Sequence, residues 1–446
     1  MTWPSNFQHL STMNRQPENN MKPLQAKQIA LLVIPPDQQN TDLWCSPMAG
    51  MTFIVRQARL ASRANVSSVW IICPSTLTEM ASCVPDQHYA PELKILSYDT
   101  ETEGPDTVLS TLPRAGRYIV FSSDCVYDHK LFAGLANYDP KNQQNCLAIT
   151  SDNKKQPIWI CDAQSLPLAV KTVSTPESSL PDNILAFETD LPVYTVTCRN
   201  DLKKLENRLW DQCRKDIDGL VSTWVNRHIS LAISKRIINT TITPNQVTVF
   251  AVLLGILAAL IAASGNYWAV LIGAGLLQIS SIIDGVDGEI ARMRVQSSVM
   301  GEWLDTIGDD VVNICFVLAI GYGAHQTGAD IVWSYMAILC ATLMFSISAI
   351  YYVWLARAGR GDILSTDWFQ SGDKLVASES AKSHGLSSLK TTVYAWATKL
   401  FRRDLLIAII FLTALAGVVH YSLLIFIPAS LATLAAQLVK MFDGKK

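Results

Sequence analysis

Six long apolar runs in the second half of the chain restrict its fold more than any other feature. They contain almost no charged residues and lie at 247–263, 269–283, 307–323, 331–355, 405–419 and 423–439. A helix needs about 17–25 apolar residues to cross a bilayer, which these runs reach or closely approach. Only 17% of the 446 residues are charged, against about 25% in ordinary soluble chains. The pattern predicts six membrane spans, and buried helices of a soluble protein are the alternative.

Basic residues orient these spans. Residues 202–236 carry eight Lys or Arg and residues 356–404 carry another eight, whereas the connections 265–268, 324–330 and 420–422 carry none. Because basic loops stay on the cytoplasmic side, both termini and the first half are expected in the cytoplasm. The predicted location is therefore the cytoplasmic (inner) membrane, as a multi-pass protein. The net charge of −2 gives no sign of nucleic-acid binding.

The first half has a different character. Residues 1–28 are polar and are expected to form a disordered tail. In 29–216, apolar runs at 29–34, 68–73 and 118–122 read as buried strands, and 51–64 reads as a crossover helix. Strands that alternate with helices predict an α/β domain with a mostly parallel sheet. The ten cysteines include no C-x-x-C pair, which argues against a zinc ribbon or a disulfide framework.

A short segment joins the two halves. Residues 217–241 place apolar and basic side chains at helical spacing. This pattern predicts an amphipathic juxtamembrane helix on the membrane surface, and a linker helix packed on the soluble domain is the alternative. The polar stretch 357–398 is expected to be an exposed cytoplasmic loop, either a plain linker or a gate over the active site.

Acidic residues gather where the second span ends and the third begins. The stretch 284–310 contains seven of them: Asp284, Asp287, Glu289, Glu302, Asp305, Asp309 and Asp310. Spacings of three and four put Asp284 with Asp287, and Asp305 with Asp309, on one helix face each. Two facing helices could present these four carboxylates to one volume, where they need positive charge between them.

Oxygen ligands of this kind suit Mg²⁺ or Mn²⁺. Gly288 and Gly301 leave room for a phosphate group, and Arg292 offers a planar fork to its oxygens. A metal site beside an arginine and an open space for phosphate is suited to phosphoryl-group chemistry. An EF-hand loop is excluded by the spacing, a solvated loop does not explain the helical pairs, and an ion-translocating cluster remains the alternative.

The same residues resemble the signature of the CDP-alcohol phosphotransferase family at every fixed position. The matching string is Asp284-x2-Asp287-Gly288-x2-Ala291-Arg292-x8-Gly301-x3-Asp305-x3-Asp309. The segment 243–248 (TPNQVT) and the number of spans are also similar to that family. The resemblance covers about residues 220–440, so 242–440 is expected to be an all-α bundle of six transmembrane helices.

The resemblance implies a transferase that moves a phosphoalcohol group from a CDP-alcohol to the hydroxyl of an alcohol or lipid acceptor and releases CMP. Such chemistry belongs to phospholipid or inositol-phosphodiester biosynthesis. It implies a two-metal site on Asp284, Asp287, Asp305 and Asp309, with Asp309 also the general base. It further implies a CDP site lined by Gly288, Ala291, Arg292 and Gly301, and a homodimer. A catalytically silent scaffold or an ion-binding transporter is the competing hypothesis.

The first half resembles a nucleotidyltransferase domain. The two-domain order is similar to that of the bifunctional inositol-1-phosphate cytidylyltransferase/di-myo-inositol phosphate phosphate synthase proteins, with 121–127 (FSSDCVY) placed like their metal-binding strand. Active members have a Gly-rich basic loop after the first strand, but here residues 35–40 read PPDQQN. Proline removes the amide donors that such a loop needs. We therefore expect a degenerate domain without cytidylyltransferase activity.

One further basic pair lies just before the fifth apolar run. Arg402 and Arg403 are on the same side of the membrane as the carboxylates in the predicted topology. Topology alone requires basic residues there. Our hypothesis is that Arg403 also holds an anionic acceptor.

Overall fold

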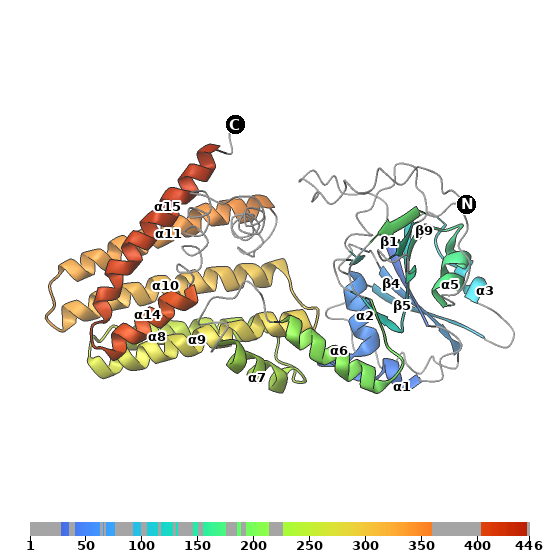
Figure 1. The fold of residues 1–446 in the computed structure, drawn as a ribbon, viewed down its shortest axis with the longest axis horizontal. Coiled ribbons are helices and arrows are strands. Elements are labelled where there is room, and N and C mark those ends of the chain that lie inside the picture. Colours follow the sequence, from blue (N-terminus) through green and yellow to red (C-terminus); the bar gives the residue numbers. More distant parts are fainter. Residues whose placement is uncertain are drawn as a thin grey trace, which may run out of the picture. The chain divides into compact units, whose positions relative to one another are not determined.

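A computed structural model gives the fold of the chain as two compact units (Figure 1). The first unit comprises 1–39 and 57–195, and the second comprises 40–56 and 196–446. The structure describes residues 28–34, 41–62, 66, 68–75, 92–99, 105–114, 117–127, 131–132, 146–149, 155–174, 185–188, 193–213, 226–358 and 403–443. The predicted tail 1–28, except its last residue, and the predicted loop 357–398, except its first two residues, lie outside these ranges.

The first unit is built on a seven-stranded sheet with the strand order β10-β8-β9-β6-β1-β4-β5. Its strands are β1 (Gln28–Val33), β4 (Ser68–Pro74), β5 (Glu92–Tyr98), β6 (Arg117–Ser122), β8 (Cys146–Ile149), β9 (Lys155–Asp162) and β10 (Leu185–Glu188). β1 is parallel to β4 and β6, and only β9 runs antiparallel to its neighbours in this sheet. This confirms the α/β prediction and the three predicted strands.

Helices α2 (Phe53–Ser62), α3 (Pro105–Leu109) and α5 (Leu166–Ser174) accompany the sheet (Figure 1). Ile29, Leu31 and Val33 of β1 join one core cluster with residues of α5. Ala30 and Leu32 point to the opposite face and are fully buried as well. Burial on both faces explains why the strand reads as a continuous apolar run.

Several short elements lie in residues 40–56 of the second unit and in the rest of the first unit. They are the helix α1 (Thr41–Trp44), the hairpin strands β2 (Pro47–Met48) and β3 (Met51–Thr52), and the pair β7 (Cys125–Val126) and β11 (Tyr194–Thr195). Cys45 is disulfide-bonded, while the described cysteines 73, 125, 161, 198, 213, 315 and 340 are free. The sequence did not reveal this bridge, because no cysteine spacing marks it.

From residue 196 onward, the described part of the second unit is helical. Helix α6 (Arg199–Gln212) and helix α7 (Arg227–Ile237) precede six further helices. These are α8 (Pro244–Ala262), α9 (Tyr267–Met293), α10 (Val299–Gln326), α11 (Val332–Ala358), α14 (Arg403–Leu415) and α15 (Leu423–Asp443), with the turn η5 (Val419–Ser422) before the last. Contacts join α8 to α9 and α10, α10 to α11, α11 to α15, and α14 to α9.

Four of the described helices, α8 to α11, are long and apolar enough to cross a membrane. Their outward side chains are apolar, as in Leu253 and Leu260, which are 60% and 69% exposed. Their contacts are made by small residues: a Cβ on Gly273 would lie 2.7 Å from the carbonyl oxygen of Ala258. Close helix packing through small residues is typical of membrane bundles. The chain is therefore a membrane protein.

Candidate active site

The carboxylates come together because α9 and α10 form a hairpin. Only five residues separate the end of α9 from the start of α10. Asp284 and Asp287 lie in the last three turns of α9, and Asp305 and Asp309 lie in the first three turns of α10. Ser298 caps α10 by accepting a hydrogen bond from the backbone N–H of Gly301 at 3.0 Å, which fixes where that helix starts.

Three of these carboxylates share one small volume. One oxygen each from Asp284, Asp287 and Asp305 lies within 4.8 Å of the others. Asp287 is 7% exposed, and Oδ1 of Asp305 is buried without a hydrogen-bond partner among the described residues. Buried carboxylates so close together repel unless positive charge lies between them. Their all-oxygen donor set therefore fits a hard divalent cation such as Mg²⁺ or Mn²⁺.

Arg403, the first residue of α14, connects the two carboxylate helices. Its Nη1 lies 3.0 Å from Oδ2 of Asp284 and also donates to Oδ2 of Asp309. Sequence analysis selected this arginine, and the structure places it against the carboxylates. Asp309 thus lies beside the three-carboxylate group and shares an arginine with it.

Helix α8 supports the group from another side. The hydroxyl of Thr248 donates to Oδ2 of Asp287. The start of α8 is fixed by a capping box, in which Thr243 N–H donates to Gln246 Oε1 at 2.9 Å and Gln246 N–H donates to Thr243 Oγ1. Pro244 occupies the first turn, where its missing N–H costs nothing. The cap therefore places Thr248, two residues beyond Gln246, over the carboxylates.

The residues expected to bind CDP lie nearby. Gly288 faces Arg292, because a Cβ on Gly288 would lie 3.2 Å from Arg292 Nη1. Nε and Nη2 of Arg292 are buried and lack hydrogen-bond partners among the described residues. Ala291 is half-buried in the same turns of α9. Gly301 is on α10, where a Cβ would lie 3.0 Å from Asn245 Oδ1.

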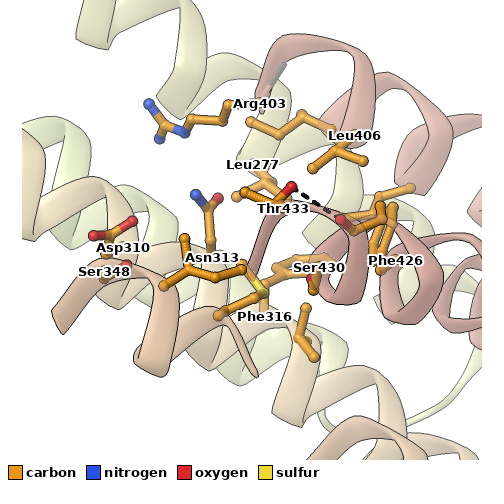
Figure 2. Close-up of a pocket in the computed structure, with 16 residues that line it drawn as sticks. Leu277, Asp310, Asn313, Phe316, Ser348, Arg403, Leu406, Phe426, Ser430 and Thr433 are labelled. Atoms are coloured by element: carbon orange, nitrogen blue, oxygen red, sulfur yellow. Dashed lines mark hydrogen bonds between the residues drawn. The ribbon is translucent and has the colours of Figure 1, made fainter. Parts of the chain in front are cut away.

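A cavity of about 200 Å³ lies between the helices and is bounded at one end by Asp310 and Arg403 (Figure 2). Its lining is mostly apolar: Leu277, Phe316, Val317, Met344, Ile347, Leu406, Ile407, Ile410, Phe426 and Ala429, with the polar Asp310, Asn313, Ser348, Arg403, Ser430 and Thr433. Figure 2 shows the charged groups of Asp310 and Arg403 on the side away from Phe426. Tyr352 donates to Oδ2 of Asp310 at 2.6 Å.

Sequence analysis missed three features of this site. It did not assign Thr248 to Asp287, Tyr352 to Asp310, or any partner to Glu289. Only Thr248 carried a signal, since it lies in the segment 243–248. In the first unit, Asp124 follows β6 and accepts a hydrogen bond from Ser122 Oγ, whereas the loop 35–40 lies outside the described residues.

Comparison with known proteins finds a family match within the helical region. The family model for CDP-alcohol phosphatidyltransferase matches residues 241–427. A bifunctional IPC transferase and DIPP synthase of Aquifex aeolicus is 34% identical over 157 residues, which are 35% of this chain and 34% of that protein. The match thus spans about a third of the length of this relative.

Two solved structures each resemble part of the chain. A phosphatidylinositol phosphate synthase of Mycobacterium tuberculosis with CDP-DAG bound is 18% identical, with a TM-score of 0.34, covering 47% of this chain and 92% of that one. A 4-diphosphocytidyl-2C-methyl-D-erythritol synthase of Anaerococcus prevotii is 10% identical, with a TM-score of 0.32, covering 41% of this chain and 98% of that one.

Proposed function

We propose that the chain is an integral-membrane CDP-alcohol phosphotransferase. It transfers a substituted phosphate group from a CDP-alcohol to an acceptor hydroxyl and releases CMP. One observation carries this proposal: carboxylate oxygens of Asp284, Asp287 and Asp305 lie within 4.8 Å of one another. These three residues are fixed positions of the family signature. A role in phospholipid or inositol-phosphodiester biosynthesis follows from the same chemistry.

The four carboxylates would have different roles. Asp284, Asp287 and Asp305 would hold the metal pair, and Asp309 would contribute a ligand. Bound Mg²⁺ or Mn²⁺ would offset the charge of the diphosphate and of the departing CMP. On the donor side, Gly288, Ala291, Arg292 and Gly301 would line the CDP site, where the buried nitrogens of Arg292 face phosphate oxygens.

Asp309 would act as general base. It takes the proton of the acceptor hydroxyl as the acceptor oxygen bonds to the phosphorus that carries the donor alcohol. The bond from that phosphorus to the bridging oxygen breaks, and CMP leaves with that oxygen. Arg403 donates to both Asp309 and Asp284, so it orients the base and places a positive charge where an anionic acceptor would lie.

The cavity supports a lipid as one of the two substrates. It begins at Asp310 and Arg403 and reaches Val317, about 10 Å further along α10 at about 1.5 Å per residue. Ten of its sixteen lining residues are apolar. A substrate with a polar head at the carboxylates and an apolar chain in the cavity fits this distribution. CDP-diacylglycerol with a polar acceptor, and a CDP-linked headgroup with a lipid acceptor, both meet this requirement.

A cavity-filling variant tests the lipid assignment. Ala429 lines the cavity and is 6% exposed, so Ala429→Phe should lower turnover of a long-chain lipid substrate more than that of a short-chain analogue. Ala435→Phe, at an exposed position of the same helix, is the matched control. Assays with the lipid as donor or as acceptor distinguish the two arrangements. If the two variants changed the turnover of the long-chain and the short-chain substrate equally, a lipid in this cavity would be contradicted.

Two further proposals concern the assembly. Both termini and α7 would lie on the cytoplasmic side, supported by the exposed Lys235 and Arg236 in the last turn of α7 and by the basic segment 356–404. The enzyme would act as a homodimer, as the family resemblance implies. Labelling of single cysteines from either side, and the mass of the detergent-solubilised protein, test these proposals.

The first unit would lack cytidylyltransferase activity. Support comes from the sequence PPDQQN at 35–40 and from Asp124, whose carboxylate is engaged by Ser122 within its own turn. The purified chain should form no CDP-alcohol from CTP and an alcohol phosphate. Formation of labelled CDP-alcohol from labelled CTP would overturn this proposal.

CMP release by the purified, detergent-solubilised protein tests the function as a whole. A panel of CDP-alcohols and acceptors with Mg²⁺ or Mn²⁺ should yield CMP with at least one pair and none in the presence of a chelator. Absence of CMP with every pair, together with absence of CDP binding by calorimetry, would favour the scaffold or transporter hypothesis.

A further inference from the structure

Helix α7 packs against the same stretch of α9 that carries two of the carboxylates. Asp287 and Glu289 are two residues apart, which is about 200° around a helix. Asp287 accordingly belongs to the cluster with Asp305, while Glu289 points away from it and toward α7. The two sides of this turn of α9 therefore serve different partners.

Glu289 is fully buried, and both of its oxygens are engaged by α7. Oε1 accepts hydrogen bonds from Arg227 Nη1 at 2.9 Å and Ser230 Oγ at 2.7 Å. Oε2 accepts one from Ser234 Oγ at 2.6 Å. Ser230 and Ser234 are themselves 0% exposed. A buried carboxylate is tolerated only when it is paired and hydrogen-bonded, so this contact fixes the orientation of both helices.

The two ends of α7 are also tied to α9. Asn226, just before α7, accepts a hydrogen bond from Gln278 Nε2 at 2.8 Å. At the end of α7, Arg294, the residue that follows α9, donates to the carbonyl oxygens of Ile237 and Ile238 at 3.2 and 2.6 Å. Contacts with α7 therefore extend along α9 from Gln278 to Arg294, on both sides of the carboxylates.

The carboxylate positions are sensitive to rotation of α9. With side-chain oxygens about 5–6 Å from the helix axis, a rotation of about 10° moves them by about 1 Å. Misplacement by about 1 Å can cost about 100-fold in rate. Thr248 holds Asp287 from α8, and Glu289 is bound by α7 on the other side of the same turn. Together the two contacts resist rotation.

We propose that Glu289 is a positioning residue: by binding Arg227, Ser230 and Ser234 of α7, it holds Asp284 and Asp287 in the geometry that binds the metal ions. The juxtamembrane helix is thus a working part of the active site and not a tether. The kinetic consequences rest on the proposed function, whereas metal binding does not.

Mn²⁺ binding by the full-length protein, measured by electron paramagnetic resonance without a CDP-alcohol, tests the proposal directly. Glu289→Gln keeps the shape and removes the charge that Arg227 needs, and it should weaken Mn²⁺ binding at least tenfold. Glu302→Gln, which removes the same charge from the first turn of α10, should stay within twofold of wild type. Should Glu289→Gln not fold, Ser230→Ala/Ser234→Ala should weaken Mn²⁺ binding at least threefold.

A double-mutant cycle separates positioning from simple stabilisation. Arg227→Met, Glu289→Gln and the double variant should weaken Mn²⁺ binding by similar factors, because each breaks the same contact. In the CMP assay, kcat should fall while the KM of the CDP-alcohol changes less than threefold.

The proposal would be overturned if folded Glu289→Gln bound Mn²⁺ with wild-type affinity. It would also be overturned if the effects of the two single variants simply multiplied in the double variant. Wild-type protein that binds Mn²⁺ but releases no CMP would refute the proposed function and leave this test intact.

Discussion

Thr248→Val is the perturbation whose effect follows most directly from the geometry. Valine keeps the shape of threonine and removes the hydroxyl that donates to Oδ2 of Asp287. Thr248 is 2% exposed, so bulk water cannot readily replace that donor. A hydrogen bond to a charged group contributes about 1.5–3 kcal/mol, which corresponds to a factor of about 10–150 at about 1.4 kcal/mol per tenfold. Mn²⁺ affinity should therefore fall at least tenfold.

The assay is CMP release as a function of Mn²⁺ concentration, with Mn²⁺ binding measured in parallel. Thr248→Val should raise the half-saturating Mn²⁺ concentration at least tenfold and restore most of the turnover at saturating Mn²⁺. Thr342→Val is the matched control, because the Thr342 hydroxyl bonds only the carbonyl of Ile338 in its own helix, at 2.8 Å among the described contacts. A half-saturating Mn²⁺ concentration within twofold of that control would refute the proposal that Asp287 binds the metal and is held in place by Thr248.

Three other predictions concern different parts of the chain. Arg403→Ala should raise the KM of the acceptor about tenfold and that of the CDP-alcohol much less; equal rises would count against a role at the acceptor. Gly308→Ala should lower the free energy of unfolding by about 1–3 kcal/mol, because the new Cβ would lie 2.4 Å from Val252 Cγ2. Adding Val252→Ala to this variant should restore thermal stability. The pKa of Asp201 is lowered mainly by its hydrogen bond from Thr197. The ionised Asp201 stabilises the fold above the usual pKa of 3.8, and this stabilisation is lost as the pH falls through the lower pKa of the folded state. The melting temperatures of Asp201→Asn and wild type should therefore converge at low pH. A difference in melting temperature that stays constant with pH would contradict this.

The sequence was most informative where the pattern is local. The strands at 28–33, 68–74 and 117–122 were predictable because burial on both faces of a sheet requires continuous apolar runs. The carboxylate pairs were predictable because helical spacing alone puts Asp284 with Asp287 and Asp305 with Asp309. The apolar spans followed from the length that a bilayer requires.

The sequence did not show which distant segments contact each other. Glu289 and Arg227 are 62 residues apart, and Arg403 and Asp284 are 119 residues apart. Periodicity reports which face of a helix a residue occupies and carries no information about the helix that faces it. The antiparallel direction of β9 escaped prediction for the same reason, since its apolar residues 158–161 look like those of a parallel strand.

The central claim is that Asp309 removes the proton from an acceptor hydroxyl beside metal-binding carboxylates. The most direct test is the rate of CMP release by Asp309→Asn at saturating Mn²⁺. Asp330→Asn, in the connection between α10 and α11, is the control for loss of one charge. Loss of a general base predicts a decrease of about 10²–10⁴-fold with CDP-alcohol binding retained, and wild-type rates in the control. CMP release by Asp309→Asn at the rate of the control would contradict the account.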